Sequence, residues 1–271
     1  MNRLARRIAD RRVRRLMGRY RRAGVILPDG SREPTPGGVP QGGPLSPLLA
    51  NVRLDDLDQE LERRGLRFAR YADDFLIFVR SQRAAQRVRR SMSRCIEGRL
   101  RRRINPIKPK ATRLSACTFL GFALRRGRLH WTDAAVKRFK ERVREITKRS
   151  NGRNMQIRIE ALKRYVSGWL NDFGHSQSDA EVVELDQWLR RRVRLCYWKQ
   201  WKRPRTRRRH RLALGRSRDQ VTLATRSRKG YWRMAGTSIV QRALSQQWLG
   251  DHGVPTMRQQ WIDLQYGASA S

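Results

Sequence analysis

Two adjacent carboxylates, Asp73 and Asp74, are the first residues of this 271-residue chain whose types and spacing indicate chemistry. Residues 66–71 alternate polar and apolar side chains, and residues 75–79 form an apolar run typical of a buried strand. The pattern predicts a β-hairpin with the Asp pair at its turn. Turn carboxylates can bind a hard cation such as Mg²⁺, although an Asp pair is also ordinary turn chemistry, since Asp bonds its own backbone.

A Gly- and Pro-rich segment, GVPQGGPLSPLLAN at residues 38–51, precedes the Asp pair. Such a loop lets the backbone approach a ligand closely, or it is a plain connector before a helix. We expect the helix over residues 46–64, with Ser46 as its N-cap, Pro47 at its first position and Gly65 as its stop. Its buried face is predicted to carry Leu54, Leu57 and Leu61.

In this order, the loop and RYADDF at residues 70–75 resemble the palm of reverse transcriptases, and the pair is similar to the group II intron-encoded reverse transcriptase and maturase family. The resemblance implies RNA-directed DNA polymerase chemistry with Mg²⁺ at Asp73 and Asp74. It also implies that the residues in contact with nucleotide or template are Gln41, Gly42, Asn105 and Lys108. The strand that it implies for gripping the primer end consists of Phe119, Leu120, Gly121 and Phe122. The alternative to nucleotide binding by Lys108 is a solvated lysine in a basic loop. The alternative to primer contact by residues 119–122 is a plain core strand.

The metal site implied by this resemblance is incomplete in the sequence. Two-metal nucleotidyl transfer needs a further carboxylate from a neighbouring strand, because successive strand residues point to opposite faces. In the resembled family that Asp lies before the helix that begins near Met1, so the chain starts too late to contain it. We therefore expect a truncated form that cannot polymerise alone, or a non-enzymatic RNA-binding maturase or splicing factor with a vestigial YADD.

The charge balance of the chain is strongly basic. It has 63 Lys and Arg against 23 Asp and Glu, a formal net charge of +40, so a polyanion is the expected partner. The resemblance makes that partner structured group II intron RNA, with a DNA primer or target as a further one, and leaves an ordinary DNA-binding protein as a third reading. No apolar run reaches transmembrane length, so we do not expect a membrane as a partner. We expect a cytoplasmic location. Three widely spaced cysteines favour neither disulfides nor zinc.

The periodicity predicts an α+β fold in two parts. Residues 1–130 are expected to form a partial reverse-transcriptase palm, a small antiparallel sheet with helices that includes a strand at 118–124. Residues 131–271 are expected to form an all-α maturase, or thumb, bundle with a basic extension. Apolar residues recur at helical spacing along three stretches of this part, which are residues 136–146, 159–173 and 185–196.

The second part also carries the densest run of basic and aromatic residues. RYVSGWLNDF at 164–173 and LDQWLRRRVRLCYWKQWKRPRTRRR at 185–209 resemble the maturase-specific domain of the same family. Cations that neutralise phosphates and rings that stack on unpaired bases suit RNA. The predicted RNA-binding residues are Arg190, Arg191, Arg194, Trp198, Lys199, Trp201, Lys202, Arg203, Arg205, Arg207, Arg208 and Arg209. A solvated helix face is the alternative for the basic residues, and a place in the helix core is the alternative for the two Trp residues.

Overall fold

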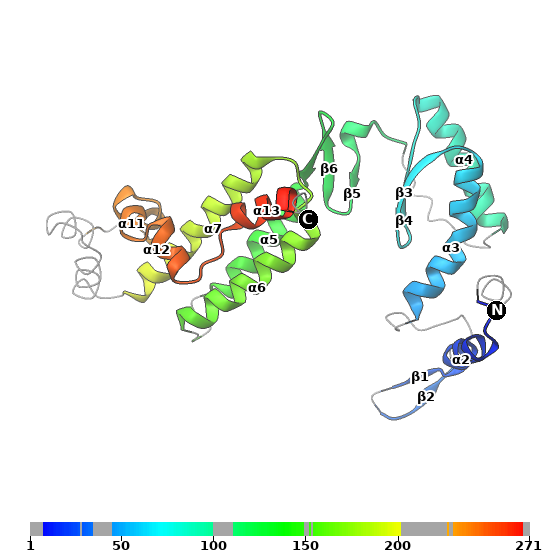
Figure 1. Cartoon of the computed structure of the whole chain (residues 1–271), viewed down its shortest axis with the longest axis horizontal. Helices are drawn as coiled ribbons and strands as arrows, with labels where there is room; N and C mark the ends of the chain where they lie inside the picture. Colours follow the sequence, from blue (N-terminus) through cyan, green and yellow to red (C-terminus); the bar gives the residue numbers. More distant parts are fainter. Residues whose placement is uncertain are drawn as a thin grey trace. The chain divides into compact units, whose positions relative to one another are not determined.

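A computed structural model of the chain forms two compact units, unit 1 over residues 1–113 and unit 2 over residues 114–271 (Figure 1). The structure describes the residues in the ranges 8–27, 29–34, 45–99, 111–148, 152, 154–201, 227 and 230–267. Both units mix helices with small antiparallel sheets, so the α+β class is confirmed at this level. Among the described residues, no helix combines the length and apolar character needed to cross a bilayer.

Unit 1 is built around a helix, a hairpin and a second helix that follow one another in sequence. The described elements are α2 (Arg11–Arg22), β1 (Val25–Ile26), β2 (Arg32–Glu33), α3 (Ser46–Arg63), β3 (Arg67–Tyr71), β4 (Asp74–Phe78) and α4 (Gln82–Arg99). Strands β3 and β4 pair antiparallel, and β1 pairs with β2. The core consists of two residues from α3 and two from α4, which are Leu57, Leu61, Met92 and Ile96. The predicted buried face of α3 is confirmed, with Leu54 packed at its margin.

The two ends of α3 differ in how well the sequence predicts them. Gly65 stops the helix as expected, because it adopts a left-handed φ of +62° and Leu66 N–H donates to Leu61 O at 3.0 Å. The predicted N-cap is wrong by one residue. Leu45 occupies the N-cap without a side-chain hydrogen bond, and Ser46 lies in the first turn with Pro47.

Glu60 is a buried carboxylate on α3, with its side chain 4% exposed. It accepts hydrogen bonds from Arg63 and Arg64, and these lower its pKa from 4.5 to about 2. A pKa lowered on folding stabilises the folded state above the unfolded pKa, and that stabilisation is lost as the pH falls from 4.5 towards about 2.

We expect Glu60→Gln to lower the stability of unit 1 at neutral pH and to flatten its loss between pH 4.5 and about 2. All eight Trp residues lie in unit 2, so tryptophan fluorescence reports that unit alone while far-ultraviolet circular dichroism reports both. The dichroism transition should shift, and the fluorescence transition should not. An acid transition that keeps its slope in the variant would contradict the assigned role of Glu60.

Unit 2 begins with a short 3₁₀ turn at Leu114–Ala116 and a three-stranded antiparallel meander of β5 (Thr118–Phe119), β6 (Phe122–Arg125) and β7 (Arg128–Trp131). The single strand predicted at 118–124 is therefore wrong. Leu120 and Gly121 both have positive φ, 51° and 82°, and turn the chain back on itself. Residues of a two-residue hairpin turn need such angles, and the apolar run hid the turn because only Gly121 marked it.

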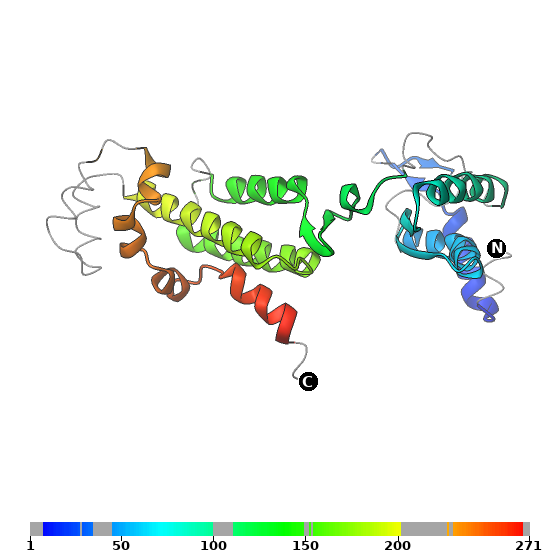
Figure 2. The same ribbon diagram turned by 90° about the horizontal axis from the view of Figure 1, so that it is seen from above.

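Three long helices follow the meander, as their apolar stripes predict. They are α5 (Asp133–Ile146), α6 (Met155–Phe173) and α7 (Asp179–Gln200). Thr132, Asn154 and Ser178 cap their first turns with side-chain oxygens. The described residues after residue 229 form four shorter helices, α10 (Tyr231–Ala235), α11 (Ser238–Ala243), α12 (Gln246–Asp251) and α13 (Met257–Tyr266). Figure 2 shows α13, in red, beside the long helices, and it packs against both α6 and α7.

A single apolar core joins the meander to the helices of unit 2. Trp131, at the end of β7, is 2% exposed, and its indole N–H donates to Phe173 O at 2.8 Å. Its ring meets the Trp169 ring edge-on, with the centroids 4.8 Å apart. Phe139 and Leu189 bring α5 and α7 into the same cluster. The three cysteines are free thiols, and Cys196 is buried in this core.

The compact units divide between residues 113 and 114, earlier in the chain than the domain division predicted after residue 130. The physical reason is the attachment of the meander to unit 2. Leu129 exchanges hydrogen bonds with Gln177 at the α6–α7 connection, at 2.8 and 3.1 Å, and His130 Nδ1 lies 2.9 Å from Glu181 Oε1. Strands that were expected to belong to a palm sheet are therefore part of the helical unit.

Candidate nucleic-acid interface

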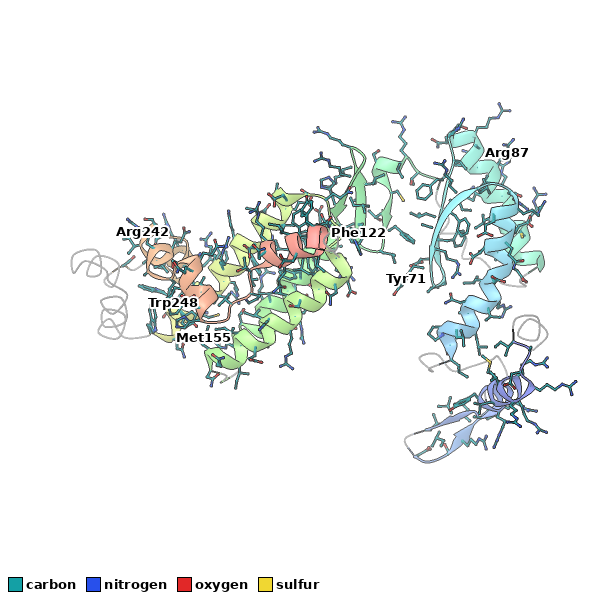
Figure 3. All side chains as sticks on the ribbon, in the orientation of Figure 1. Tyr71, Arg87, Phe122, Met155, Arg242 and Trp248 are labelled. Atoms are coloured by element: carbon teal, nitrogen blue, oxygen red, sulfur yellow. The ribbon has the colours of Figure 1, made fainter. Side chains whose placement is uncertain are left out.

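The Asp pair lies at the turn of the β3–β4 hairpin, as the sequence predicts. Tyr71 and Asp74 are the last paired residues, and Ala72 and Asp73 form the turn, with Ala72 at a left-handed φ of 53°. Figure 3 labels Tyr71 at this end of the hairpin. Both carboxylates are exposed, and within the described part of the chain neither has a side-chain hydrogen bond or an ion pair. The turn therefore presents two accessible anionic groups.

Arg70 fixes this turn to helix α3. Its guanidinium donates to both carboxylate oxygens of Asp58, at 2.8 and 2.6 Å, and to Asn51 Oδ1 at 2.9 Å. The Nη1 atom of Arg70, which donates to Asn51, also donates to Ala72 O at 2.9 Å, so one side chain joins the strand, the helix and the turn. The hydrogen bond with Asp58 raises the pKa of Arg70 and keeps it charged. This clamp was not predictable from sequence patterns, because its partners lie far apart along the chain.

The described residues do not complete a two-metal site. Among them, no group of three or more His, Cys, Asp or Glu side chains is arranged to hold a metal ion. Asp73 and Asp74 follow each other across the turn, and the nearby Asp58 is occupied by Arg70. Mg²⁺ is implied by the reverse-transcriptase resemblance alone, and these residues by themselves do not fit a pair of ions.

The residues predicted to contact nucleotide and primer divide into two groups. Gln41, Gly42, Asn105 and Lys108 lie outside the described residues. Phe119, Leu120, Gly121 and Phe122 form the β5–β6 hairpin of unit 2 rather than a single strand. The Phe122 ring lies 5.6 Å from the Phe173 ring, and a Cβ on Gly121 would clash with Phe173, so this hairpin packs on α6 (Figure 3). Primer binding by these residues stays a prediction.

Six of the predicted RNA-binding residues, Lys202, Arg203, Arg205, Arg207, Arg208 and Arg209, lie outside the described residues. Arg190 and Arg194 are described, and they have structural partners instead. Arg190 pairs with the buried Asp186 at 3.0 Å, and Arg194, which is buried, donates to Leu244 O at 2.8 Å. Burial raises the pKa of Asp186, and the charge of Arg190 opposes that shift. These internal contacts disfavour an RNA role for Arg190 and Arg194, which stays a prediction.

Trp198 and Trp201 lie in the core, which favours the alternative of a packing role over their predicted role as stacking platforms for bases. They are 2% and 6% exposed, and their rings meet edge-on with the centroids 6.3 Å apart. A base needs an open ring face, which neither side chain offers. Lys199 lies on the outer side of the same helix, with its ammonium 5.7 Å from the ring centre of Tyr231 in α10.

Sequence reasoning missed a surface cluster on α5, α7 and α10. The Trp188 and Trp232 rings lie 6.5 Å apart, and the Arg191 guanidinium lies over Trp232 at 4.2 Å. Lys140 and Arg144 approach Trp188 at 5.7 and 5.5 Å. We name Lys140, Arg144, Trp188, Arg191 and Trp232 the tryptophan–cation cluster. Only Arg191 was predicted to bind RNA, because Lys140, Arg144 and Trp232 lie on elements far from α7 in sequence.

Two protein-family models match different parts of the chain. A model described as reverse transcriptase (RNA-dependent DNA polymerase) matches residues 13–124, and one described as group II intron, maturase-specific domain matches residues 136–215. Together, these two matches support a likeness to group II intron reverse transcriptases and maturases. Protein YkfC of Escherichia coli (strain K12) is 30% identical over 171 residues, a match that covers 50% of this chain and 45% of that protein. The chain thus spans less than half the length of this relative.

The boundary between the two family matches lies later in the chain than the boundary between the two compact units. The reverse-transcriptase match contains the Asp73–Asp74 turn and the Arg70 clamp, and it ends in β6. The maturase-specific match contains most of α5, all of α6 and α7, and the basic segment after Trp201. Four of the five residues of the tryptophan–cation cluster lie inside that match, and Trp232 lies beyond it.

Proposed function

We propose that this chain binds the structured RNA of a group II intron, with unit 2 as the module that carries the binding. The observation that carries the proposal is the maturase-specific match over residues 136–215, which coincides with the α5–α7 bundle. The formal net charge of +40 supports it, because cations that neutralise phosphates release counterions and supply most of the affinity for nucleic acid.

RNA-directed DNA polymerisation is the second candidate function, and a DNA primer or target is a partner only under this candidate. The exposed carboxylates of Asp73 and Asp74, which have no ion pair among the described residues, lie within the reverse-transcriptase match and favour it. In this reading Arg70 holds the turn in its left-handed conformation, so that both carboxylates stay presented. An RNA-binding maturase without polymerase activity keeps the same RNA surface and does not need the Asp pair.

Competition binding tests the proposed RNA function directly. The full chain is titrated with a labelled, folded group II intron domain, and unlabelled duplex DNA of equal length is added as competitor. We expect the intron RNA to stay bound at DNA concentrations well above its own, because duplex DNA offers phosphates but neither unpaired bases nor RNA tertiary shape. Equal competition by duplex DNA, or by anionic lipid vesicles, would remove the basis of the proposal.

A paired substitution separates the two candidate functions. Asp73→Asn with Asp74→Asn should leave RNA binding unchanged, since both residues lie on the unit 1 hairpin. Template-directed extension of a primer by the unaltered chain, lost in this double variant, would establish polymerisation. Extension that survives the double variant would rule out the Asp pair as its metal ligands.

A further inference from the structure

Trp232 is the most exposed of the eight Trp residues, at 37%. It lies on α10 and faces Trp188 of α7, whose ring is only partly buried at the edge of the core. By contrast, Trp131, Trp198 and Trp201 are buried. Large aromatic side chains left partly open on a surface usually mark a site where another molecule binds.

The Arg191 guanidinium is held over Trp232 by hydrogen bonds. Its Nε and Nη2 atoms donate to Trp232 O at 3.2 and 3.0 Å, and its Cζ lies 4.2 Å from the ring centre. Gly236 leaves the space that this requires, because a Cβ there would come within 2.8 Å of the guanidinium. The charge of Arg191 is therefore fixed in position beside the open ring, without an ion-pair partner among the described residues.

Helix α5 adds a row of cations on the Trp188 side of the cluster. Lys137, Lys140 and Arg144 recur every three or four residues on the side away from the buried Phe139 and Val143. The row spans roughly 10 Å at the α-helical rise. Its last two members are those that approach Trp188. The nearest acids in sequence are Glu141 and Glu145 on α5 and Glu184 one turn before Trp188, and Glu145 pairs with Arg142 at 2.7 Å. The three cations of the row and Arg191 therefore outnumber these three acids.

We propose that the tryptophan–cation cluster binds an unpaired nucleotide of RNA. The base stacks on the open part of Trp232, Arg191 fixes the ring from its other side, and Arg144 and Lys140 neutralise the adjoining phosphates. This assignment rests on the proposed function and names the RNA feature that unit 2 recognises. A paired base has both faces covered by its neighbours in the helix, so only an unpaired base offers a face to Trp232.

Binding measurements on the full chain test this site with two RNAs, a hairpin with an unpaired loop and a fully paired duplex of the same length. Trp232→Ala should weaken binding of the looped RNA by roughly 5- to 150-fold, the usual effect of removing one stacking ring, and leave the duplex unchanged. Trp232→Phe keeps a ring and should retain most of the affinity. Arg144→Gln should weaken both RNAs more than Arg138→Gln, a matched change on a different side of α5.

Each outcome separates the site from the proposed function. Failure of the unaltered chain to bind either RNA would refute the proposed function itself. Unaltered binding of the looped RNA by Trp232→Ala, or equal competition by polyglutamate as an acidic-peptide probe, would overturn the site and leave RNA binding in place. If Trp232→Ala lowers the melting temperature, a second experiment tests the site without a substitution, namely photo-crosslinking of the unaltered chain to an RNA loop that contains 5-iodouridine. A crosslink at Trp232 is expected, and its absence would contradict the proposal.

Discussion

Raising the salt concentration from 50 to 200 mM is expected to weaken RNA binding by about 10³- to 10⁵-fold, the loss typical of a protein that neutralises six to ten phosphates. The reason is the excess of 63 Lys and Arg over 23 Asp and Glu, since each neutralised phosphate releases condensed counterions whose entropy gain falls as salt rises. Filter binding across a salt series measures the slope. A flat response would contradict an electrostatic origin of the affinity.

A fourfold substitution locates the cations responsible for that slope. Changing Arg205, Arg207, Arg208 and Arg209 to Ala should reduce its magnitude by about 0.7 to 0.9 for each phosphate that the variant no longer neutralises. The matched control removes four exposed arginines from α2 of unit 1, which are Arg11, Arg12, Arg15 and Arg19. A control with the larger effect would move the main RNA surface from unit 2 to unit 1.

Trp198→Ala is expected to destabilise unit 2 by about 3–5 kcal/mol, because the ring is 2% exposed and its removal leaves a cavity in the core. The melting temperature should fall by roughly 2–4 °C for each kcal/mol in a unit of this size. Thermal denaturation followed by circular dichroism measures the change. Trp198→Phe keeps part of the ring volume, so its melting temperature should lie between those of the unaltered chain and Trp198→Ala.

RNA affinity of the same variant separates packing from stacking. At a temperature where Trp198→Ala is still folded, its affinity for looped RNA should equal that of the unaltered chain, since the buried ring offers no face to a base. A large loss of affinity with an unchanged melting temperature would restore Trp198 to the RNA surface.

Local periodicity and turn chemistry made much of the fold predictable. The Asp73–Asp74 turn, the stop of α3 at Gly65 and the three long helices of unit 2 depend on residues within a few positions of one another. In each case the apolar pattern or the turn residue favours the same local structure that tertiary packing requires. The incorrect predictions at Ser46 and at the β5–β6 turn are also local. The turn was missed because one glycine in an apolar run is a weak signal.

The roles of individual side chains on α7 were not predictable in the same way. A run of Arg and Trp has the same composition whether its members face solvent, Asp186 or the core, and the packing of the later helices against α7 decides between these. Arg194 and Trp198 face inward, whereas Arg191 reaches the exposed ring of Trp232. Composition therefore predicts a polyanion as the partner, and the three-dimensional packing favours different residues for the proposed RNA contact.

The return of α13 to α6 and α7 sets an order for the biosynthesis of the protein. Met257 N–H donates to Asp186, and the indole N–H of Trp261 donates to Ser176 O, across 71 and 85 residues. The core of unit 2 can therefore close only after the ribosome has made α13, whereas the α3–β3–β4–α4 segment has all its core partners within 45–99. The carboxylate-bearing hairpin is thus complete while the helical bundle of unit 2 is still open on the nascent chain.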